Sequence, residues 1–216
     1  MKQTILITGA SSGFGLMAAT RLFEAGYNVI GTSRNPAKVD VPFRMMALDI
    51  ADDASITAFT GELFRHISRL DVLVNNAGFY LSGLAEETTI AQGRKQFDTN
   101  FWGTVNLTNE LLPHFRKQRS GKILTVGSIM GLLNFPNAAY YGASKHALEG
   151  YFKSLRFELS EFNIRVAMVE PMGFKTNLVD SQVRAQEKID DYNNYRHKIE
   201  RFSKDFFDKS PEPTPV

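Results

Sequence analysis

Short apolar runs rich in β-branched residues alternate along this chain with longer segments in which apolar residues recur at helical spacing. The runs predict six strands, at Thr4–Thr8, Tyr27–Ser33, Phe43–Leu48, Leu70–Asn75, Lys122–Val126 and Ile164–Val169. Helices are expected between them, at Gly15–Ala25, Asp52–Ser68, in two stretches within about Thr89–Gln118, and at about Ala139–Phe162. Because the runs lack polar/apolar alternation, we expect helices on both faces of the sheet. This order predicts a doubly wound parallel sheet within a three-layer α/β/α fold.

The last forty residues break the alternation. From Asn177 to Lys209 the chain is polar with apolar residues at helical spacing, and a proline-rich tail follows. No strand-like run follows Val169, so six strands are predicted. We expect a single domain whose body is residues 1–176, with residues 177–216 as a helical segment and tail.

Composition excludes several classes of function. A net charge of +2 without a basic block argues against nucleic-acid binding. The absence of cysteine excludes disulfides, thiol catalysis and zinc–thiolate sites, and the four histidines lack metal-ligand spacing. No apolar run approaches the ~20 residues of a membrane span, and the first one begins at Ile5, too early for a signal peptide. We expect a soluble, cytoplasmic protein with no metal site.

A glycine-rich loop, Thr8–Gly15, joins the first predicted strand to the first helix. Gly9, Gly13 and Gly15 would allow a tight turn, close approach of a pyrophosphate, and close packing of helix on strand. The N–H groups that open the helix would bind the phosphates. An ordinary Gly/Ser turn is the alternative, and the spacing differs from G-x-G-x-x-G. The strand before and the helix after favour a dinucleotide site.

The end of the second strand bears on the choice of cofactor. An acidic residue there usually holds the ribose hydroxyls of NAD, but this chain has Thr32-Ser33-Arg34. The guanidinium of Arg34 suits a phosphate dianion, so we expect NADP(H) rather than NAD(H). A solvated surface arginine is the alternative.

Tyr141 and Lys145 open a predicted helix and share one face of it, because residues i and i+4 are neighbours there. A nearby cation favours the phenolate, so such a pair can transfer a proton near neutral pH. Taken alone, the pair would usually be a surface contact. Ser128, at the end of the strand Lys122–Val126, strengthens the case, because ligands bind at that edge of open α/β sheets.

Together these residues resemble the short-chain dehydrogenase/reductase family, over about Lys2–Leu178. Thr8–Gly15 matches its TGxxxGxG loop, and Asn75-Asn76-Ala77-Gly78 matches its NNAG. Tyr141 and Lys145 match its YxxxK, with Ser128 thirteen residues before the tyrosine. Weaker matches are Asn100, the pair Asp49-Ile50, and Pro171–Thr176, which corresponds to PGxxxT with Met172 in place of the glycine.

The resemblance implies a Rossmann-like fold and reversible hydride transfer between NADP(H) and a carbonyl or alcohol. It implies that Ser128 polarises the substrate oxygen, Tyr141 is the acid or base, Lys145 holds the nicotinamide ribose and lowers the tyrosine pKa, and Asn100 orders a water in the proton relay. The expected cofactor-binding residues are Gly9, Ser11, Ser12, Gly13, Phe14, Gly15, Ser33, Arg34, Asp49, Ile50, Asn75, Ala77, Gly78, Tyr141, Lys145, Pro171, Phe174 and Thr176.

Residues beside the inferred site are mostly apolar, which predicts a hydrophobic ketone or alcohol as substrate. They are Phe79, Tyr80, Leu81, Met130, Leu132, Leu133, Phe135, Met172 and Phe174. No nearby cation is expected to grip a substrate carboxylate or phosphate. The stretch Asn177–Lys209 resembles the family's substrate-covering segment, with a solvated surface helix as the alternative.

Two further expectations follow from the resemblance, and one alternative function stays open. Family members usually add a seventh strand, so we expect this chain to be shortened and the edge strand Ile164–Val169 to be open to pairing. We also expect a homodimer or homotetramer. A regulator that senses a dinucleotide without turnover is the alternative function, but it would have no need to keep Ser128, Tyr141 and Lys145.

Overall fold

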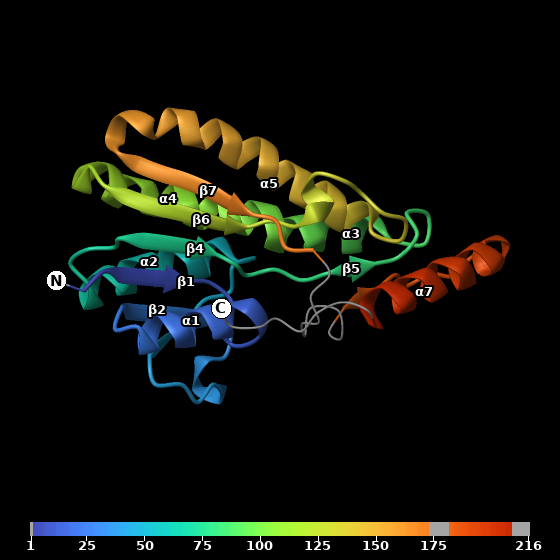
Figure 1. Cartoon of the computed structure of the whole chain (residues 1–216), viewed down its shortest axis with the longest axis horizontal. Coiled ribbons are helices and arrows are strands. Elements are labelled where there is room, and N and C mark those ends of the chain that lie inside the picture. The colour runs from blue at the N-terminus through green and yellow to red at the C-terminus, as the bar shows by residue number, and fades with distance from the viewer. Residues whose placement is uncertain (1, 173–181, 209–216) are drawn as a thin grey trace.

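The computed structural model describes residues 2–172 and 182–208. Within them, six parallel strands form one sheet in the order β3-β2-β1-β4-β6-β7. These strands are β1 (Thr4–Ile7), β2 (Asn28–Ser33), β3 (Arg44–Ala47), β4 (Val72–Asn75), β6 (Gly121–Val126) and β7 (Ile164–Val169). The strand order reverses between β1 and β4, which confirms the predicted doubly wound, Rossmann-like sheet (Figure 1).

Helices cover the sheet in layers. The longer ones are α1 (Gly13–Glu24), α2 (Asp53–His66), α3 (Ile90–Phe97), α4 (Thr104–Gln118), α5 (Ala139–Glu158) and α7 (Asn193–Asp208). Apolar residues of α2, α4 and α5 pack with the strands into the larger core cluster, and α1 packs into a second cluster on the other face. Figure 1 shows α7 extending away from the body, beyond the carboxyl ends of the strands.

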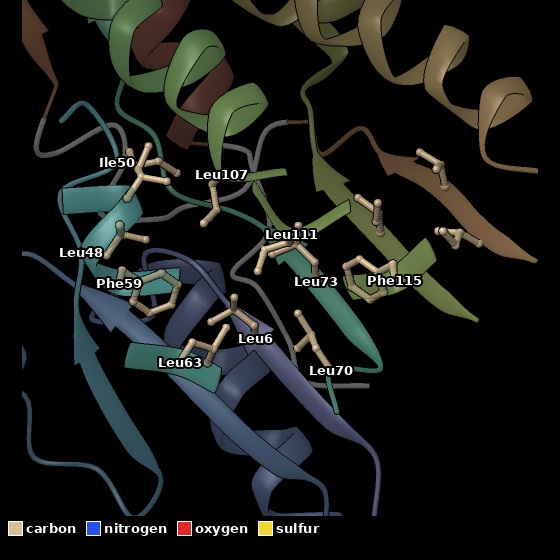
Figure 2. Packing of buried hydrophobic residues seen from close by; sticks show 14 of the residues in the cluster. Leu6, Leu48, Ile50, Phe59, Leu63, Leu70, Leu73, Leu107, Leu111 and Phe115 are labelled. Carbon is tan, nitrogen blue, oxygen red and sulfur yellow. The ribbon is translucent and has the colours of Figure 1, made fainter. Parts of the chain in front are cut away.

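The larger cluster joins the sheet to α2 and α4. Figure 2 shows Leu6 of β1 beside Leu63 of α2, and Leu111 of α4 beside Leu73 of β4; all four side chains are 0% exposed. Each such side chain stabilises the fold by roughly 1.5–3 kcal/mol relative to an exposed one. This packing holds the carboxyl ends of β1 and β4 in fixed register.

The edge strand β7 departs from the prediction that helices cover both faces. Ile164 and Val166 are buried, whereas Arg165 and Ala167 between them are exposed. The buried pair packs with α5 residues in the larger core cluster. The expectation of a uniformly apolar, doubly covered sheet is therefore wrong at β7 among the described residues, because that strand has the alternation of a sheet with one solvated face.

A second small sheet was not predicted. β5 (Leu81–Ser82) pairs in parallel with β8 (Val183–Arg184), so the expectation that no strand follows Val169 is wrong. Two residues are too few for a periodic pattern, and the pairing is set by contacts 102 positions apart along the chain. It fixes the segment before α7 to the segment that follows β4.

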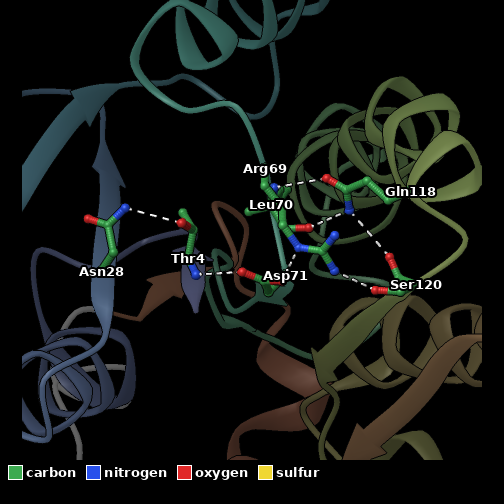
Figure 3. Close-up of polar contacts among 7 residues, drawn as sticks. All are labelled: Thr4, Asn28, Arg69, Leu70, Asp71, Gln118 and Ser120. Atoms are coloured by element: carbon green, nitrogen blue, oxygen red, sulfur yellow. Dashed lines mark hydrogen bonds and ion pairs between the residues drawn. The ribbon is translucent and has the colours of Figure 1, made fainter. Parts of the chain in front are cut away.

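Polar contacts fasten the amino ends of the central strands. Asp71 accepts a hydrogen bond from the backbone N–H of Thr4 at 2.8 Å, and Arg69 bridges Asp71 and Ser120, with both distances 2.6 Å (Figure 3). Gln118 pairs with the backbone of Leu70 through both ends of its amide. These contacts hold the amino ends of β1, β4 and β6 together, at the end of the sheet opposite the loops that follow the carboxyl ends of the strands.

Candidate active site

A cavity of about 1100 Å³ lies at the carboxyl ends of the strands. Most of the predicted site residues line it: Gly9, Ser11, Ser12, Gly13, Phe14, Ser33, Arg34, Asp49, Ile50, Ala77, Gly78, Asn100, Ser128, Tyr141, Lys145 and Pro171. Gly15 and Asn75 do not line it, and Phe174 and Thr176 lie outside the described residues. The structure thus brings together residues spread over some 160 positions of the sequence.

The glycine loop is shaped by two different needs. Gly9 (φ 65°) and Gly13 (φ 54°) have left-handed backbone, which favours glycine. A Cβ on Gly9 would also lie 2.9 Å from the Cα of Ala77, and one on Gly15 would lie 2.4 Å from the Gly9 carbonyl oxygen. Gly9 and Gly15 therefore permit close packing, whereas a Cβ on Gly13 would face open space.

The start of α1 is suited to an anion. Among the described residues, Ser12 makes no side-chain capping hydrogen bond, and the first turn of α1 carries no acidic residue. The positive end of the helix dipole therefore faces the cavity wall formed by Ser11, Ser12 and Gly13. This arrangement fits a pyrophosphate.

Asn75 and Asn76 have different roles in the structure. Asn75 is buried, and its amide donates to Thr108 and Thr125, at 3.0 and 3.3 Å. Asn76, which is not among the expected cofactor-binding residues, lines the cavity and donates to the carbonyl oxygens of Thr8 and Gly9. The same loop is held by the Thr8 hydroxyl, which accepts the N–H groups of Asn76 and Ala77 at 2.9 Å. The NNAG segment therefore positions the glycine loop.

Ser33 and Arg34 line the cavity at the end of β2. The hydroxyl oxygen of Ser33 is buried and has no hydrogen-bond partner among the described residues. Such an orphaned polar atom is costly unless a ligand engages it. Arg34 is the next residue and also lines the cavity, so the corner formed by Ser33 and Arg34 fits a phosphate or hydroxyl group of a bound nucleotide.

Ser128, Tyr141 and Lys145 meet at the cavity wall with exposures of 9%, 5% and 7%. Ser128 follows β6, and its hydroxyl accepts the N–H of Met130 at 3.2 Å and neighbours the phenol of Tyr141. Lys145, one helical turn after Tyr141 on α5, donates from Nζ to the carbonyl oxygen of Val126 at 2.8 Å. Its Nζ lies 5.8 Å from the centre of the Tyr141 ring.

Burial dominates the ionisation of this group. It raises the pKa of Tyr141 to about 12, against the opposing effect of the neighbouring Ser128 hydroxyl, so the expectation that Lys145 lowers this pKa below its ordinary value is wrong. Burial also lowers the pKa of Lys145 to about 8, with Glu170 acting in the opposite direction. The phenol is therefore protonated at neutral pH, which is the form that can donate a proton to a carbonyl oxygen.

Asn100 lies in a π-helical turn, Asp98–Gly103, between α3 and α4, so the two predicted helical stretches run on from each other. A Cβ on Gly103 would lie 1.9 Å from the carbonyl oxygen of Ile50, so only glycine allows this approach. The side chain of Asn100 is buried and binds the backbone of Phe79, donating to its carbonyl and accepting its N–H, both at 3.0 Å. Turns of this kind are frequent at functional sites.

Apolar side chains line much of the rest of the cavity. Tyr80 packs edge-on against Tyr141, with ring centres 4.7 Å apart. Of the residues predicted for the substrate side, Phe79, Tyr80, Met130, Phe135 and Met172 line the cavity, and Leu81, Leu132 and Leu133 do not. Lys95 and Lys198 also line it, so the expectation of no nearby cation is wrong. Both lie on helices, α3 and α7, whose approach was not predictable from local pattern.

The segment before α7 is fastened near the cavity. The buried carboxylate of Glu87 pairs with Arg196 of α7 and accepts the N–H of Ile189 at 2.8 Å. Tyr195, Ile199 and Phe202 of α7 line the cavity. The stretch predicted as a cover therefore contributes part of the wall, while Phe202 is also 62% exposed.

The described residues contain no group of three or more acidic, histidine or cysteine side chains that could hold a metal ion. Within the same part of the chain, no helix is long and apolar enough to cross a membrane.

Comparison with known proteins gives consistent matches. Residues 3–187 match the family model described as short chain dehydrogenase. A 3-ketodihydrosphingosine reductase of Bacteroides thetaiotaomicron is 41% identical over 180 residues, covering 83% of this chain and 67% of that protein.

Solved structures agree. A short-chain dehydrogenase from Streptomyces avermitilis has a TM-score of 0.88 and 33% identity, covering 99% of this chain and 80% of that one. ElxO with NADP bound has a TM-score of 0.76 and 33% identity, covering 83% of this chain and 77% of that one. A 3-ketoacyl-(acyl-carrier-protein) reductase from Brucella melitensis, complexed with NADH, has a TM-score of 0.77 and 28% identity, covering 83% of this chain and 79% of that one.

Proposed function

This chain belongs to the short-chain dehydrogenase/reductase family of NAD(P)-dependent oxidoreductases, and on that premise we propose that it transfers a hydride between NADP(H) and the carbonyl or alcohol group of a hydrophobic small molecule. One observation carries the proposal. The cavity that holds Ser128, Tyr141 and Lys145 at one wall holds the glycine loop and the Ser33–Arg34 corner at another.

The residues present fit a dinucleotide with a 2′-phosphate. Ser11, Ser12 and Gly13 at the start of α1 would hold the pyrophosphate, and Asp49 and Ile50 would contact the adenine. Arg34 and the orphaned hydroxyl of Ser33 would bind the 2′-phosphate. Nicotinamide, when bound, supplies or accepts the hydride. Among solved relatives, ElxO binds NADP and the Brucella melitensis reductase binds NADH, so the preference for NADP(H) rests on Ser33 and Arg34 of this chain.

In the reducing direction, the hydroxyl of Ser128 would hydrogen-bond the substrate carbonyl oxygen and Tyr141 would donate its proton to that oxygen. Ser128 and the Tyr141 phenol are neighbours at the cavity wall, so both can reach one oxygen atom. The ammonium of Lys145, held by the Val126 carbonyl, would stabilise the phenolate that forms. Asn100 would keep its side chain on Phe79 and shape the adjoining wall.

The wall formed by Phe79, Tyr80, Met130, Phe135 and Met172 supports an apolar substrate, because an apolar lining favours an apolar ligand. The name of the Bacteroides thetaiotaomicron relative gives a ketone as its substrate, which agrees with this class. We place the cofactor and catalytic parts in residues 1–176 and the substrate cover in residues 177–216 of the same domain. A homodimer or homotetramer stays a prediction.

The test is NADPH oxidation by the purified protein, followed by absorbance with a panel of apolar ketones and compared with NADH. We expect turnover with at least one ketone and a clear preference for NADPH. Tight binding of NADPH with no turnover on any ketone or on the corresponding alcohols with NADP⁺ would instead support the sensing regulator.

A further inference from the structure

Glu149, which is buried, and Glu170, which is half-buried, meet behind the wall that carries Ser128. Glu170 follows β7, and Glu149 lies on α5, one turn after Lys145. Each has one carboxyl oxygen, Oε1, that is buried without a conventional hydrogen-bond partner among the described residues. The two carboxyl groups nevertheless stand in hydrogen-bonding contact with each other. Ionised carboxylates only accept hydrogen bonds, so this contact requires a proton on one of them.

We propose that Glu149 and Glu170 share a single proton between their Oε1 atoms, and that this carboxyl pair positions the Ser128 loop for catalysis. The proton-sharing part does not depend on the proposed reaction, whereas the effect on catalysis rests on it.

The outer oxygens of the pair show which carboxyl holds the proton. Lys153 Nζ lies 2.9 Å from Oε2 of Glu149, a contact that favours the charged form of Glu149. Oε2 of Glu170 accepts the backbone N–H of Ser128 at 2.6 Å. Burial, followed by the hydrogen bond that a protonated Glu170 donates to Glu149, raises the pKa of Glu170 to about 7. Burial acts to raise the pKa of Glu149 as well, but its hydrogen bonds with Glu170 and Lys153 hold it below the usual value. The proton therefore belongs mainly to Glu170.

The backbone around Ser128 lies directly on the carboxyl pair. A Cβ on Gly127 would lie 2.4 Å from both carboxyl oxygens of Glu170, and one on Gly131 would lie 3.2 Å from Cγ of Glu149. Two backbone hydrogen bonds flank the contact, from Gly127 N–H to Val169 at 2.8 Å and from Ile129 N–H to Pro171 at 3.1 Å. Because glycine at 127 and 131 allows this approach, the position of Ser128 depends on where the Glu170 carboxyl sits.

Charged and titratable side chains of α5 interact with the pair. Lys145, Lys153 and His146 of α5 favour negative charge on the pair. In turn, the charge of Glu170 acts to raise the pKa of the Tyr141 phenol. When Glu170 loses the proton, two adjacent carboxylates repel each other and the link between their Oε1 atoms is lost. The ordered Ser128 loop should therefore be favoured below the pKa of Glu170 and loosened as pH rises through it.

The proton can be observed without any substrate, by infrared difference spectra of the full-length protein labelled with 13C-carboxyl glutamate. As pH falls through about 7, one buried carboxylic acid C=O band should appear, well above the pH at which exposed glutamates titrate. The band should vanish in both Glu149→Gln and Glu170→Gln, because either amide can donate to the remaining carboxylate. Glu161→Gln, an exposed glutamate after α5, is the control and should leave the band unchanged.

Kinetics then test the positioning role. Glu170→Gln imitates the protonated pair, so it should keep turnover near wild type but lose the step in kcat near pH 7. Glu170→Leu leaves the Ser128 N–H and the Glu149 oxygen unsatisfied, and should lower kcat at least ~10-fold with a smaller change in KM.

Absence of the band in wild type, or its survival in both glutamine variants, overturns the shared proton whatever the reaction is. A band that behaves as expected, with a pH step in kcat that Glu170→Gln does not remove, overturns the positioning role. If no substrate is turned over but the band behaves as expected, the proposed function fails, the positioning role fails with it, and the shared proton stands.

Discussion

The Lys145 ammonium should account for a defined part of the catalytic rate, and replacing it by methionine measures that part. Lys145→Met keeps a similar unbranched side chain in a buried position and removes the charge that lies 5.8 Å from the Tyr141 ring. With the ring centre taken as the position of the phenolate charge, an effective dielectric constant of about 20 gives an attraction of ~3 kcal/mol. At 1.36 kcal/mol per factor of ten, this is ~10²-fold in the stability of the phenolate.

The assay is alcohol oxidation by NADP⁺ at saturating concentrations of both, because Tyr141 must act there as the base. We expect kcat to fall ~10²-fold in Lys145→Met at pH 7. The pH profile should change as well. The ammonium is present below the Lys145 pKa of about 8 and is lost above it, so the wild-type rate should level off above pH 8. The variant lacks that group, and its rate should keep rising above pH 8, because burial raises the pKa of the Tyr141 phenol well above that value.

Lys117→Met, on the exposed side of α4, is the matched control and should behave as wild type. A kcat for Lys145→Met close to wild type, with the same levelling above pH 8, would refute the electrostatic role. A change in KM for NADP⁺ alone would assign Lys145 to cofactor binding only.

Three further predictions concern the cofactor corner, the glycine loop and the cover. Arg34→Ala should weaken NADPH binding by about one to two decades and leave NADH binding nearly unchanged, since a charged hydrogen bond contributes roughly 1.5–3 kcal/mol. Equal losses of affinity for NADPH and NADH, measured by titration calorimetry, would remove the basis for the NADP(H) preference. Gly9→Ala should lower the free energy of unfolding by at least ~1–3 kcal/mol, because Gly9 has a positive φ and contacts Ala77. The control Gly61→Ala, at an exposed position in α2, should raise the free energy of unfolding by roughly 0.5–1 kcal/mol. Similar denaturation midpoints for the two variants would contradict this. Arg196→Met removes the ion pair with Glu87, so it should increase hydrogen exchange in α7 and raise KM for substrate with little change in kcat. The control Arg201→Met, at an exposed position of α7, should change neither hydrogen exchange nor KM. Unchanged exchange in Arg196→Met would show that the ion pair does not hold α7.

The strands and the cofactor loop could be predicted because their signals are local. β1 and β4 are buried apolar runs, and the glycines of the loop stand between a strand and a helix. Ser128, Tyr141 and Lys145 could be placed at one site because the carboxyl ends of parallel strands meet at one edge of the sheet. The pairing of β5 with β8 could not be predicted, because two residues carry no periodicity.

The remaining site features depend on contacts between distant segments. Asn76 differs from Asn75 only in the direction its side chain takes from the end of β4, towards the loop rather than the interior. Lys95 and Lys198 reach the cavity because α3 and α7 approach it from separate parts of the chain. The contact between Glu149 and Glu170 likewise joins α5 to the end of β7, and no spacing in the sequence indicates it.

Replacing Tyr141 by phenylalanine tests the central claim most directly, since it keeps the buried ring and its edge contact with Tyr80 but removes the proton. The measurement is the rate of NADPH oxidation with a ketone that the wild type reduces, alongside NADPH binding by titration. We predict a loss of turnover of at least ~10²-fold with NADPH affinity unchanged. Near-normal turnover in Tyr141→Phe would contradict the account, because the proton would then reach the carbonyl oxygen from a group other than the Tyr141 hydroxyl.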